Sequence, residues 1–323
     1  IPKGTLKAGK NLIAVRVWDG QGGGGLTGPA NELFLKEELT VEGRASIKIP
    51  LGGEWRYKTE NIRPADPGPE PSGLNANSAS VLYNAMLYPL HRYGVQGAIW
   101  YQGESNAGNA ALYRKQLPAM VENWRRVFDN PKMAFYTVQL APFQKINPQP
   151  EDTGWARLRE AQLQAMEATK DCGIAVITDV GDEADIHPRK KGPVGERLAL
   201  AALKDRYRLK KIVGSGPTLK KVSTRGDTMQ LTFANADGGL VAAATDSAGK
   251  TVEPGKLVGF AVAGEDGNFV WADAKIVGKD RVELKAAGVA TPKFVRFGWA
   301  NFPVVNFFNA YGLPASPFRT DTK

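Results

Sequence analysis

The middle of the chain alternates between short apolar runs and longer segments in which apolar residues recur at helical spacing. Three apolar runs predict β-strands, at residues 96–102, 134–143 and 173–180. Four segments of helical spacing predict helices, at residues 78–93, 109–129, 157–170 and 194–203. The 109–129 pattern puts one apolar set near a single face: Leu112, Leu117, Val121, Trp124 and Phe128. Apolar strands that alternate with helices are typical of a parallel sheet covered on both faces.

The two ends of the chain show strand patterns instead. Short strands are predicted at residues 11–18, 45–50, 54–58, 229–233 and 281–285. Prolines at positions 64, 67, 69 and 71 mark a surface linker. We therefore expect a β segment, a linker, an α/β domain and a β-sandwich-like domain, spanning residues 1–58, 59–77, 78–212 and 213–323.

The composition agrees with an ordinary globular protein. The 323 residues suffice for two or three domains of about 150 residues each. Hydrophobic residues make up 42% and charged residues 23%, which excludes a disordered chain, a collagen and a coiled coil. No stretch approaches the roughly 18 uninterrupted apolar residues that a membrane-spanning helix needs.

The formal net charge of +9 changes this picture little. Basic residues are densest at Lys204, Arg206, Arg208, Lys210 and Lys211. We interpret this patch as a solvated helix end with a preference for anions. No nucleic-acid-binding motif accompanies it, so we do not expect a nucleic acid as partner.

Cysteine and histidine are scarce, which limits the chemistry open to the chain. The single Cys172 excludes an intramolecular disulfide and a cysteine-based zinc site. The two histidines, His91 and His187, leave little for a multi-histidine metal site. His91 ends a predicted helix, where a cation interacts favourably with the helix dipole, so we expect a structural role for it.

Two predicted strand ends carry polar residues suited to catalysis. Ligands bind beyond the carboxyl ends of parallel strands, so residues 103–107 and 181–188 should open on the same rim of the sheet. His187 follows Asp185 by two residues and Asp182 by five. A carboxylate that holds an imidazole makes it a better base and fixes its tautomer. His187 is therefore our candidate general base.

The block after the first of these strands admits two interpretations. Ser105 at a strand-to-helix junction suggests a nucleophile elbow, but Ala107 replaces the second glycine of that motif. A serine here equally suits a helix N-cap. Alternatively, the Gly103 backbone N–H and the side-chain amides of Gln102 and Asn106 form an oxyanion site.

Glu104, within the same block, either orients His187 or belongs to a hydrogen-bonded scaffold. A histidine, carboxylates and oxyanion donors on one rim together suggest serine-type hydrolysis. The nucleophile is not identified by these residues.

Several motifs then occur in a recognisable order. They are WYQGESNA at 100–107, Trp155, LREAQ at 158–162 and DIHP at 185–188. In these residues the sequence resembles bacterial sialate O-acetylesterases, SGNH-type hydrolases that remove acetyl esters from sialic acids. The ending GLPASPFRT at 312–320 is similar to the family's C-terminal β domain, and residues 1–17 resemble the close of a β domain inserted into its catalytic domain. The resemblance implies that residues 78–212 are the C-terminal part of an SGNH-like α/β domain.

Carried over residue by residue, the resemblance makes His187 the catalytic histidine and Gly103 with its neighbours the source of oxyanion donors. Asp185 is our candidate for the carboxylate that orients His187. The common SGNH pattern has an aspartate three residues before the histidine, where this chain has alanine. Asp182 and Glu104 are therefore rivals for that role.

The family's nucleophile lies in a Gly-Gln-Ser-Asn-Met block that precedes the inserted β domain, and nothing in this sequence matches it. The resemblance thus implies that an upstream N-terminal segment supplies the serine and the first strand of the sheet, and that Ser105 is not the nucleophile. The implied reaction is two-step acyl transfer on an O-acetylated sialic acid or sialoglycan, with no metal or organic cofactor. Asn84 and Arg159 are candidates for sugar contacts, with capping or ion pairing as the alternative for each.

Other functions stay open at this point. An acetylxylan esterase or another carbohydrate O-acetylesterase would use the same catalytic residues. A non-catalytic carbohydrate-binding fragment would use the β segments, and nucleic-acid binding through residues 204–211 ranks last. A sialic acid substrate suggests a secreted or periplasmic protein whose export signal lies upstream.

Overall fold

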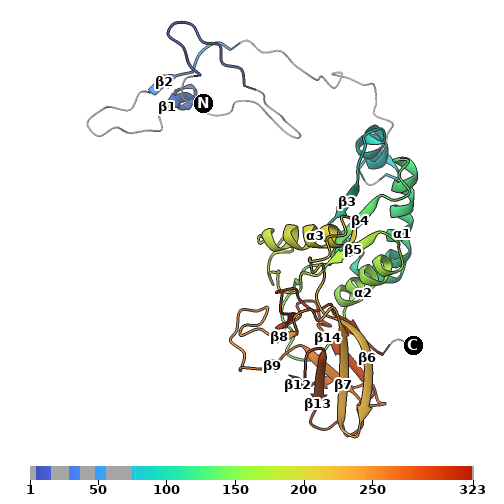
Figure 1. Cartoon of the computed structure of the whole chain (residues 1–323). Helices are drawn as coiled ribbons and strands as arrows, with labels where there is room; N and C mark the ends of the chain where they lie inside the picture. Colours follow the sequence, from blue (N-terminus) through green and yellow to red (C-terminus); the bar gives the residue numbers. More distant parts are fainter. Residues whose placement is uncertain (1–4, 16–28, 37–47, 56–74, 77, 322–323) are drawn as a thin grey trace. The chain divides into compact units, whose positions relative to one another are not determined.

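The computed structural model describes residues 5–15, 29–36, 48–55, 75–76 and 78–321 (Figure 1). The chain divides into two compact units, Ile1–Leu74 and Asn75–Lys323. In the first unit, a short 3-10 helix η1 (Ala30–Glu32) precedes strand β1 (Phe34–Lys36), which pairs antiparallel with β2 (Lys48–Pro50). The boundaries of the four predicted segments stay predictions.

Of the three strands predicted in this unit, the structure confirms part of one. The prediction at 11–18 is wrong for residues 11–15, which lie in no strand, and residues 16–18 are outside the described ranges. Residues 54 and 55 likewise lie in no strand, and residues 56–58 are not described. Only residues 48–50 of the 45–50 prediction are described, and they form β2. Most of the predicted linker, residues 59–74 and 77, is also outside the described ranges.

A three-stranded parallel sheet forms the centre of the second unit. Its strands run in the order β3 (Gly97–Trp100), β4 (Ala134–Val138) and β5 (Cys172–Ala175). The predicted parallel sheet is thereby confirmed, although β4 and β5 end about five residues earlier than predicted. Residues 139–141 and 176–178 remain buried after the chain leaves the sheet. An apolar run therefore indicates burial rather than strand pairing.

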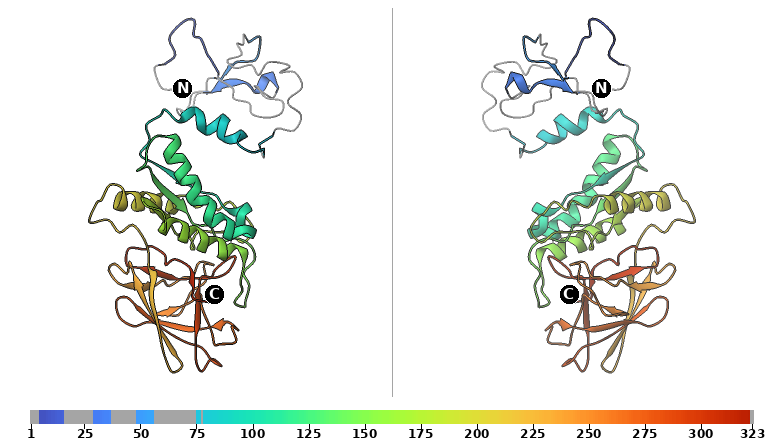
Figure 2. Two further views of the ribbon diagram at one scale, coloured as in Figure 1. Left: turned by 90° about the vertical axis from the view of Figure 1, so that its right-hand side faces the viewer. Right: turned by 90° about the vertical axis from the view of Figure 1, so that its left-hand side faces the viewer.

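Helices cover both faces of this sheet, as predicted (Figures 1 and 2). Side chains of a strand alternate between its faces, so Phe135 and Tyr136 of β4 point to opposite sides. Phe135 belongs to a core with α1 (Ala110–Val127) and α2 (Gly154–Glu167). Tyr136 belongs to a second core with α3 (Gly192–Asp205).

Two local predictions for the helices are wrong. Residues 78–93 do not form a regular α-helix with a serine cap: a π-helical turn η2 (Tyr83–Leu87) leads directly into a 3-10 turn η3 (Tyr88–Leu90). Pro89 has no N–H to donate to a regular helical ladder, which explains the interruption. In α1, Leu112 is exposed and Tyr113 is buried in its place, whereas Leu117 and Val121 are buried as predicted.

The C-terminal domain is a sandwich of antiparallel sheets. One sheet has the order β6 (Thr218–Arg225), β7 (Thr228–Ala234), β13 (Arg281–Lys285), β12 (Asp273–Ile276) and β9 (Lys256–Leu257). The other has the order β11 (Val270–Trp271), β10 (Phe260–Ala263), β14 (Phe294–Phe297) and β16 (Phe318–Arg319). A short ladder joins β15 (Phe307–Asn309) to β8 (Leu240–Ala242). The predicted β-sandwich-like domain is confirmed.

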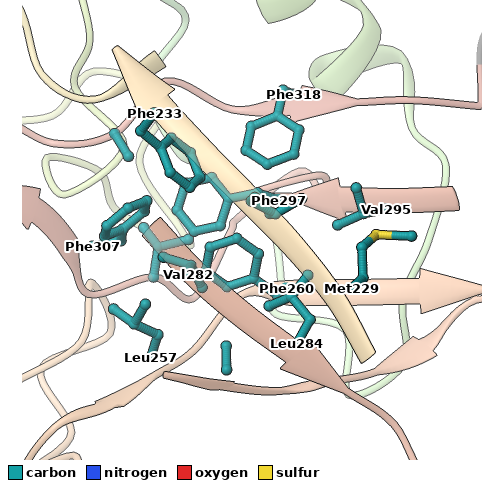
Figure 3. Close-up of a cluster of buried hydrophobic side chains, with 14 of the residues drawn as sticks. Met229, Phe233, Leu257, Phe260, Val282, Leu284, Val295, Phe297, Phe307 and Phe318 are labelled. Carbon is teal, nitrogen blue, oxygen red and sulfur yellow. The ribbon is translucent and has the colours of Figure 1, made fainter. Parts of the chain in front are cut away.

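Five phenylalanines fill the space between these sheets: Phe233, Phe260, Phe297, Phe307 and Phe318 (Figure 3). The rings of Phe260 and Phe297 lie 4.6 Å apart between centroids. Phe297 meets Phe307 edge to face at 5.6 Å, an arrangement that aromatic quadrupoles favour. These rings form the centre of the core between the two sheets.

Helix α2 joins the α/β layer to the β domain through two neighbouring charged residues. Arg159 donates hydrogen bonds to carbonyl oxygens of both layers, including Leu140 and Ala300 at 2.7 Å each. Glu160 accepts two hydrogen bonds from Arg319 of β16, at 3.0 and 2.9 Å. The two layers therefore have a fixed relation within the second unit. Across the described ranges, no helix combines the length and apolarity needed to cross a membrane.

Candidate active site

The carboxyl ends of β3 and β5 open on the same edge of the sheet, because the strands are parallel. The block at 102–106 follows β3, and the loop that carries His187 follows β5. The two segments meet where the Lys191 ammonium lies 4.6 Å from the centroid of the Tyr101 ring. The structure thus brings both predicted blocks to one rim. No hydrogen bond or ion pair among the described residues links the His187 ring to the 102–106 block.

Gly103 occupies a backbone conformation that requires glycine. Its φ is 152° and ψ is −14°, and a Cβ atom added here would lie 3.1 Å from both Gln162 Nε2 and Leu158 Cδ2. Its carbonyl accepts a 2.8 Å hydrogen bond from the N–H of Asn106, which starts the 3-10 helix η4 (Glu104–Asn109). Within the described part of the chain, nothing accepts a hydrogen bond from the Gly103 N–H. That buried donor points to an oxyanion role.

A chain of hydrogen bonds fixes the neighbouring amides. Tyr113 donates from its hydroxyl to Gln102 Oε1 at 3.0 Å, and Gln102 Nε2 donates to Asn106 Oδ1 at 2.8 Å. Gln162 Nε2 holds the Gln102 carbonyl at 3.1 Å. Gln102 thus occupies the Asn106 side-chain oxygen, and the amide nitrogen is the group of Asn106 that remains to donate. Gln102, predicted as a donor itself, here orients Asn106.

Glu104 lies beside the tyrosines of the rim rather than beside His187. Burial, with the Glu104 charge as the second cause, raises the pKa of Tyr101 to about 12. Burial also raises the pKa of Tyr113, against the hydrogen bond from Trp100. These contacts decide neither predicted role of Glu104, so both stay predictions. Ser105 is exposed in the first turn of η4 and makes no hydrogen bond to either histidine.

The His187 loop is shaped by two aspartates with different tasks. Asp182 Oδ1 accepts hydrogen bonds from the backbone N–H groups of Ala184 and Asp185, at 2.9 and 3.2 Å. Asp185 Oδ1 accepts one from the backbone of His187 at 2.9 Å and lies 3.7 Å from the ring Nδ1. Among the described carboxylates, only that of Asp185 lies within 4 Å of the ring. Asp182 forms the turn, and Asp185 is the better placed to orient the imidazole.

The His187 ring is 87% exposed, so it is open to a reactant on the rim. His91 contrasts with it: its Nδ1 lies 2.7 Å from the Tyr88 carbonyl oxygen, and its ring stacks on Tyr88 at 4.7 Å. This geometry agrees with the structural role expected for His91. No cluster of three or more histidine, cysteine or acidic side chains suited to a metal occurs in the ranges described.

The sugar contact considered for Arg159 is wrong, because its side chain is fully buried. Asn84 is exposed on η2, and its predicted sugar contact stays a prediction. A cavity of about 580 Å³ is lined by residues of η4, α1 and α2 and by Arg319 of β16; Gly108, Arg114 and Arg157 are among them. None of the predicted site residues lines it, so it is separate from the histidine loop.

Sequence reasoning missed Tyr113, Lys191 and Gln162 as parts of the site. The sequence does carry an indication for Gln162, because this polar residue directly follows Ala161 on the apolar face of the predicted helix. Such a side chain must find partners when buried, and Gln162 binds both sides of the rim, at Gln102 and Leu140.

Comparison with known proteins identifies the segment that carries both blocks. Residues 73–204 match the family model "Carbohydrate esterase, sialic acid-specific acetylesterase". This segment, which includes the whole parallel sheet, is similar to that family. The resemblance to sialate O-acetylesterases is thereby confirmed.

Relatives extend the comparison beyond the family model. The chain is 32% identical to a rat sialate O-acetylesterase over 195 residues, which are 53% of the chain and 34% of the relative. A human sialate O-acetylesterase is 32% identical over 177 residues, 48% of the chain and 32% of that protein. A crystal structure of a carbohydrate acetylesterase from Xanthomonas citri is also similar, with a TM-score of 0.67 and 41% sequence identity. The matched region covers 75% of this chain and 54% of the chain in the crystal structure. The chain spans about a third of the length of the curated relatives.

We expect Gly103→Ala to lower the free energy of unfolding by about 1–3 kcal/mol, because alanine is strained at this φ and its Cβ would press on Gln162 and Leu158. Gly108→Ala is the matched control: a Cβ there meets nothing within 4 Å, so stability should be unchanged or rise by up to about 1 kcal/mol. Urea denaturation of both variants measures the difference. A Gly103→Ala variant as stable as the parent would remove the case for a required glycine.

Proposed function

We propose that this chain supplies the histidine and the oxyanion donors of an esterase that hydrolyses O-acetyl groups on sialic acids. The observation that carries the proposal is the family match at residues 73–204, which contains both the 102–106 block and the His187 loop. The curated relatives are sialate O-acetylesterases, which supports sialic acid as the acetylated sugar.

The proposed reaction is a two-step acyl transfer. His187 takes the proton of a serine hydroxyl as the serine oxygen attacks the acetyl carbonyl, and Asp185 holds the resulting imidazolium. The Gly103 N–H and the Asn106 amide stabilise the oxyanion, a contribution worth about 2.7–4 kcal/mol for one such donor in other hydrolases. His187 then returns the proton to the sugar oxygen as it leaves. Water attacks the acetyl-serine with His187 again as base, which releases acetate and restores the serine.

We propose that the nucleophilic serine comes from an upstream segment of the same polypeptide. Among the described strands, β3 pairs with β4 alone, so its other edge is open. Ile99 of β3 is 70% exposed, although parallel strands are normally covered on both faces. A parallel strand added at this edge would end on the rim that carries His187. Ser105 stays outside the catalytic set in this proposal.

We further propose that the protein is secreted or periplasmic, because sialic acids are carried by glycans outside the cytoplasm. The substrate class supports this location. Recovery of the complete protein from the cytoplasmic fraction alone would contradict this location.

In the complete protein, His187→Ala should abolish acetate release from O-acetylated sialic acid while the circular dichroism spectrum stays unchanged. Asp185→Asn should lower kcat more than Asp182→Asn, because Asp185 adjoins the imidazole and an asparagine at 182 can still accept the turn hydrogen bonds. Residual activity of His187→Ala within about tenfold of the parent, a loss of only about 1.4 kcal/mol, would remove its role as base. The reverse ranking of the two aspartate variants would move the orienting role to Asp182.

Treatment of this chain alone with a fluorophosphonate should give no covalent adduct in intact-mass analysis, because the activated serine lies elsewhere. A stoichiometric adduct would show that the chain holds its own nucleophile. Mapping of that adduct to Ser105 would overturn the assignment of the 102–106 block to oxyanion stabilisation.

A second candidate activity is esterase action on another acetylated carbohydrate, such as acetylxylan. It is favoured by the 41% identity to a carbohydrate acetylesterase, which exceeds the identity to the sialate enzymes. Acetate release by the complete protein should be faster from O-acetylated sialic acid than from acetylated xylan at equal ester concentration. The opposite order would replace the sialic acid assignment and leave the catalytic residues unchanged.

A further inference from the structure

Arg159 ties three segments together through four hydrogen bonds to carbonyl oxygens. On the α/β side it donates to Leu140 at 2.7 Å and Ala141 at 3.1 Å, which follow β4. On the β-domain side it donates to Ala300 at 2.7 Å and Asn301 at 2.8 Å. No described carboxylate pairs with the guanidinium. The loop after β4 is therefore fixed directly to the C-terminal domain.

The same loop holds the segment that leads to His187. Asp182 bridges to Phe143, and its N–H donates to the Pro142 carbonyl at 3.3 Å. Glu183 Oε1 accepts a 2.7 Å hydrogen bond from the N–H of Ile146. Gly181 packs so closely on Pro142 that an added Cβ would lie 2.5 Å from it. These contacts leave the two loops little freedom to move apart.

A second link ties the loop after β4 to the β domain without Arg159. Asn301 accepts a 3.3 Å hydrogen bond from the Phe143 N–H, and its side-chain amide donates to Gln144 Oε1 at 2.5 Å. The backbone of Asn301 in turn donates to Glu151 at 3.2 Å. Ala300 and Asn301 of the β domain are thus linked to the loop after β4 in two ways. One link runs through Arg159, and the other is the direct contact of Asn301 with Phe143 and Gln144.

We propose that the C-terminal β domain positions the His187 loop, with Arg159 as the positioning residue that transmits this restraint. The path runs from residues 300–301 through Arg159 to residues 140–143, and from there to Asp182, whose carboxylate forms the turn before His187. The catalytic meaning of this restraint rests on the proposed function. The restraint itself concerns only described contacts of this chain.

The chemistry of Arg159 suits a positioning role. Burial lowers the pKa of its guanidinium to about 9, which reflects the cost of desolvating the charge. Carbonyl dipoles offset that cost only while all four stay in place, so displacement of any one of them is opposed. A guanidinium has a rigid, planar fork of donors that reaches several acceptors at once, whereas a lysine ammonium is a point charge.

Hydrogen exchange of this chain tests the restraint directly. The N–H groups of Ala184, Asp185 and His187 are bonded to the Asp182 and Asp185 carboxylates, so their exchange reports on the loop. Arg159→Lys should speed exchange at these three amides by about tenfold or more, corresponding to about 1.4 kcal/mol of local opening. The amides of Leu231 and Val282, paired in the β-domain core, should change much less.

Glu160→Gln is the matched control. Glu160 is adjacent to Arg159 and also joins α2 to the β domain, through Arg319, but it does not contact the loop after β4. Its exchange at the three loop amides should stay within about twofold of the parent. Equal acceleration in both variants would show that any weakening of the interface loosens the loop, and would overturn the specific role of Arg159.

Asn301→Ala provides a second variant if Arg159→Lys does not fold. It removes only the side-chain bond to Gln144, so we expect about a threefold acceleration at the same three amides. Unchanged loop exchange in Asn301→Ala would contradict the proposal, and so would an Arg159→Lys variant in which exchange rises in the β-domain core but not in the loop.

Kinetics of the complete enzyme separate this proposal from the proposed function. Arg159→Lys should lower kcat about tenfold or more with KM within about twofold, because the base is misplaced while the sugar contacts remain. A parent enzyme with no acetylesterase activity would defeat the proposed function, whereas the exchange comparison would still decide the restraint. A raised KM with unchanged kcat would contradict a positioning role.

Discussion

The second unit depends on a guanidinium that is buried without a carboxylate partner. Arg159 is fully shielded from solvent, and among the described residues only carbonyl oxygens accept hydrogen bonds from its guanidinium. Such a charge is costly to bury unless every donor is satisfied, so helix α2, the loop after β4 and residues 300–301 must assemble together. This constraint makes the β-sandwich part of the support of the catalytic rim rather than an independent appendage.

The rest of the rim follows from that assembly. Gln162, one turn along α2 from Arg159, binds the backbone of Leu140 on one side and the Gln102 carbonyl on the other. The glycine conformation at 103 is thereby set against α2, where there is no room for a side chain. Tyr113 of α1 then fixes Gln102 and, through it, Asn106. The proposed oxyanion donors and the histidine loop thus share one supporting helix.

The sequence predicted the layers well and the site only in part. Apolar periodicity reports which faces are buried, so the parallel sheet, α2 and β13 could be predicted directly. It cannot report where a buried segment leaves a sheet, which is why the predicted strands wrongly include residues 139–141 and 176–178. Arg159 could not be placed either, because an arginine beside an apolar stripe is usually solvated, and its acceptors lie about 20 and 140 residues away.

The open edge of β3 connects the fold to the proposed chemistry. Ile99 is paired in register with Tyr136, so both face the α3 side of the sheet, where α3 packs on β4 and β5. A parallel strand is normally covered on both faces. Exposure of the Ile99 side chain to water is unfavourable, and an additional element packed over it would bury that apolar surface. The acyl transfer needs a serine that reaches the rim beside Gly103 and His187. A strand paired at this edge would satisfy the packing requirement and deliver its own end to that rim, so two independent needs favour the same position for the nucleophile.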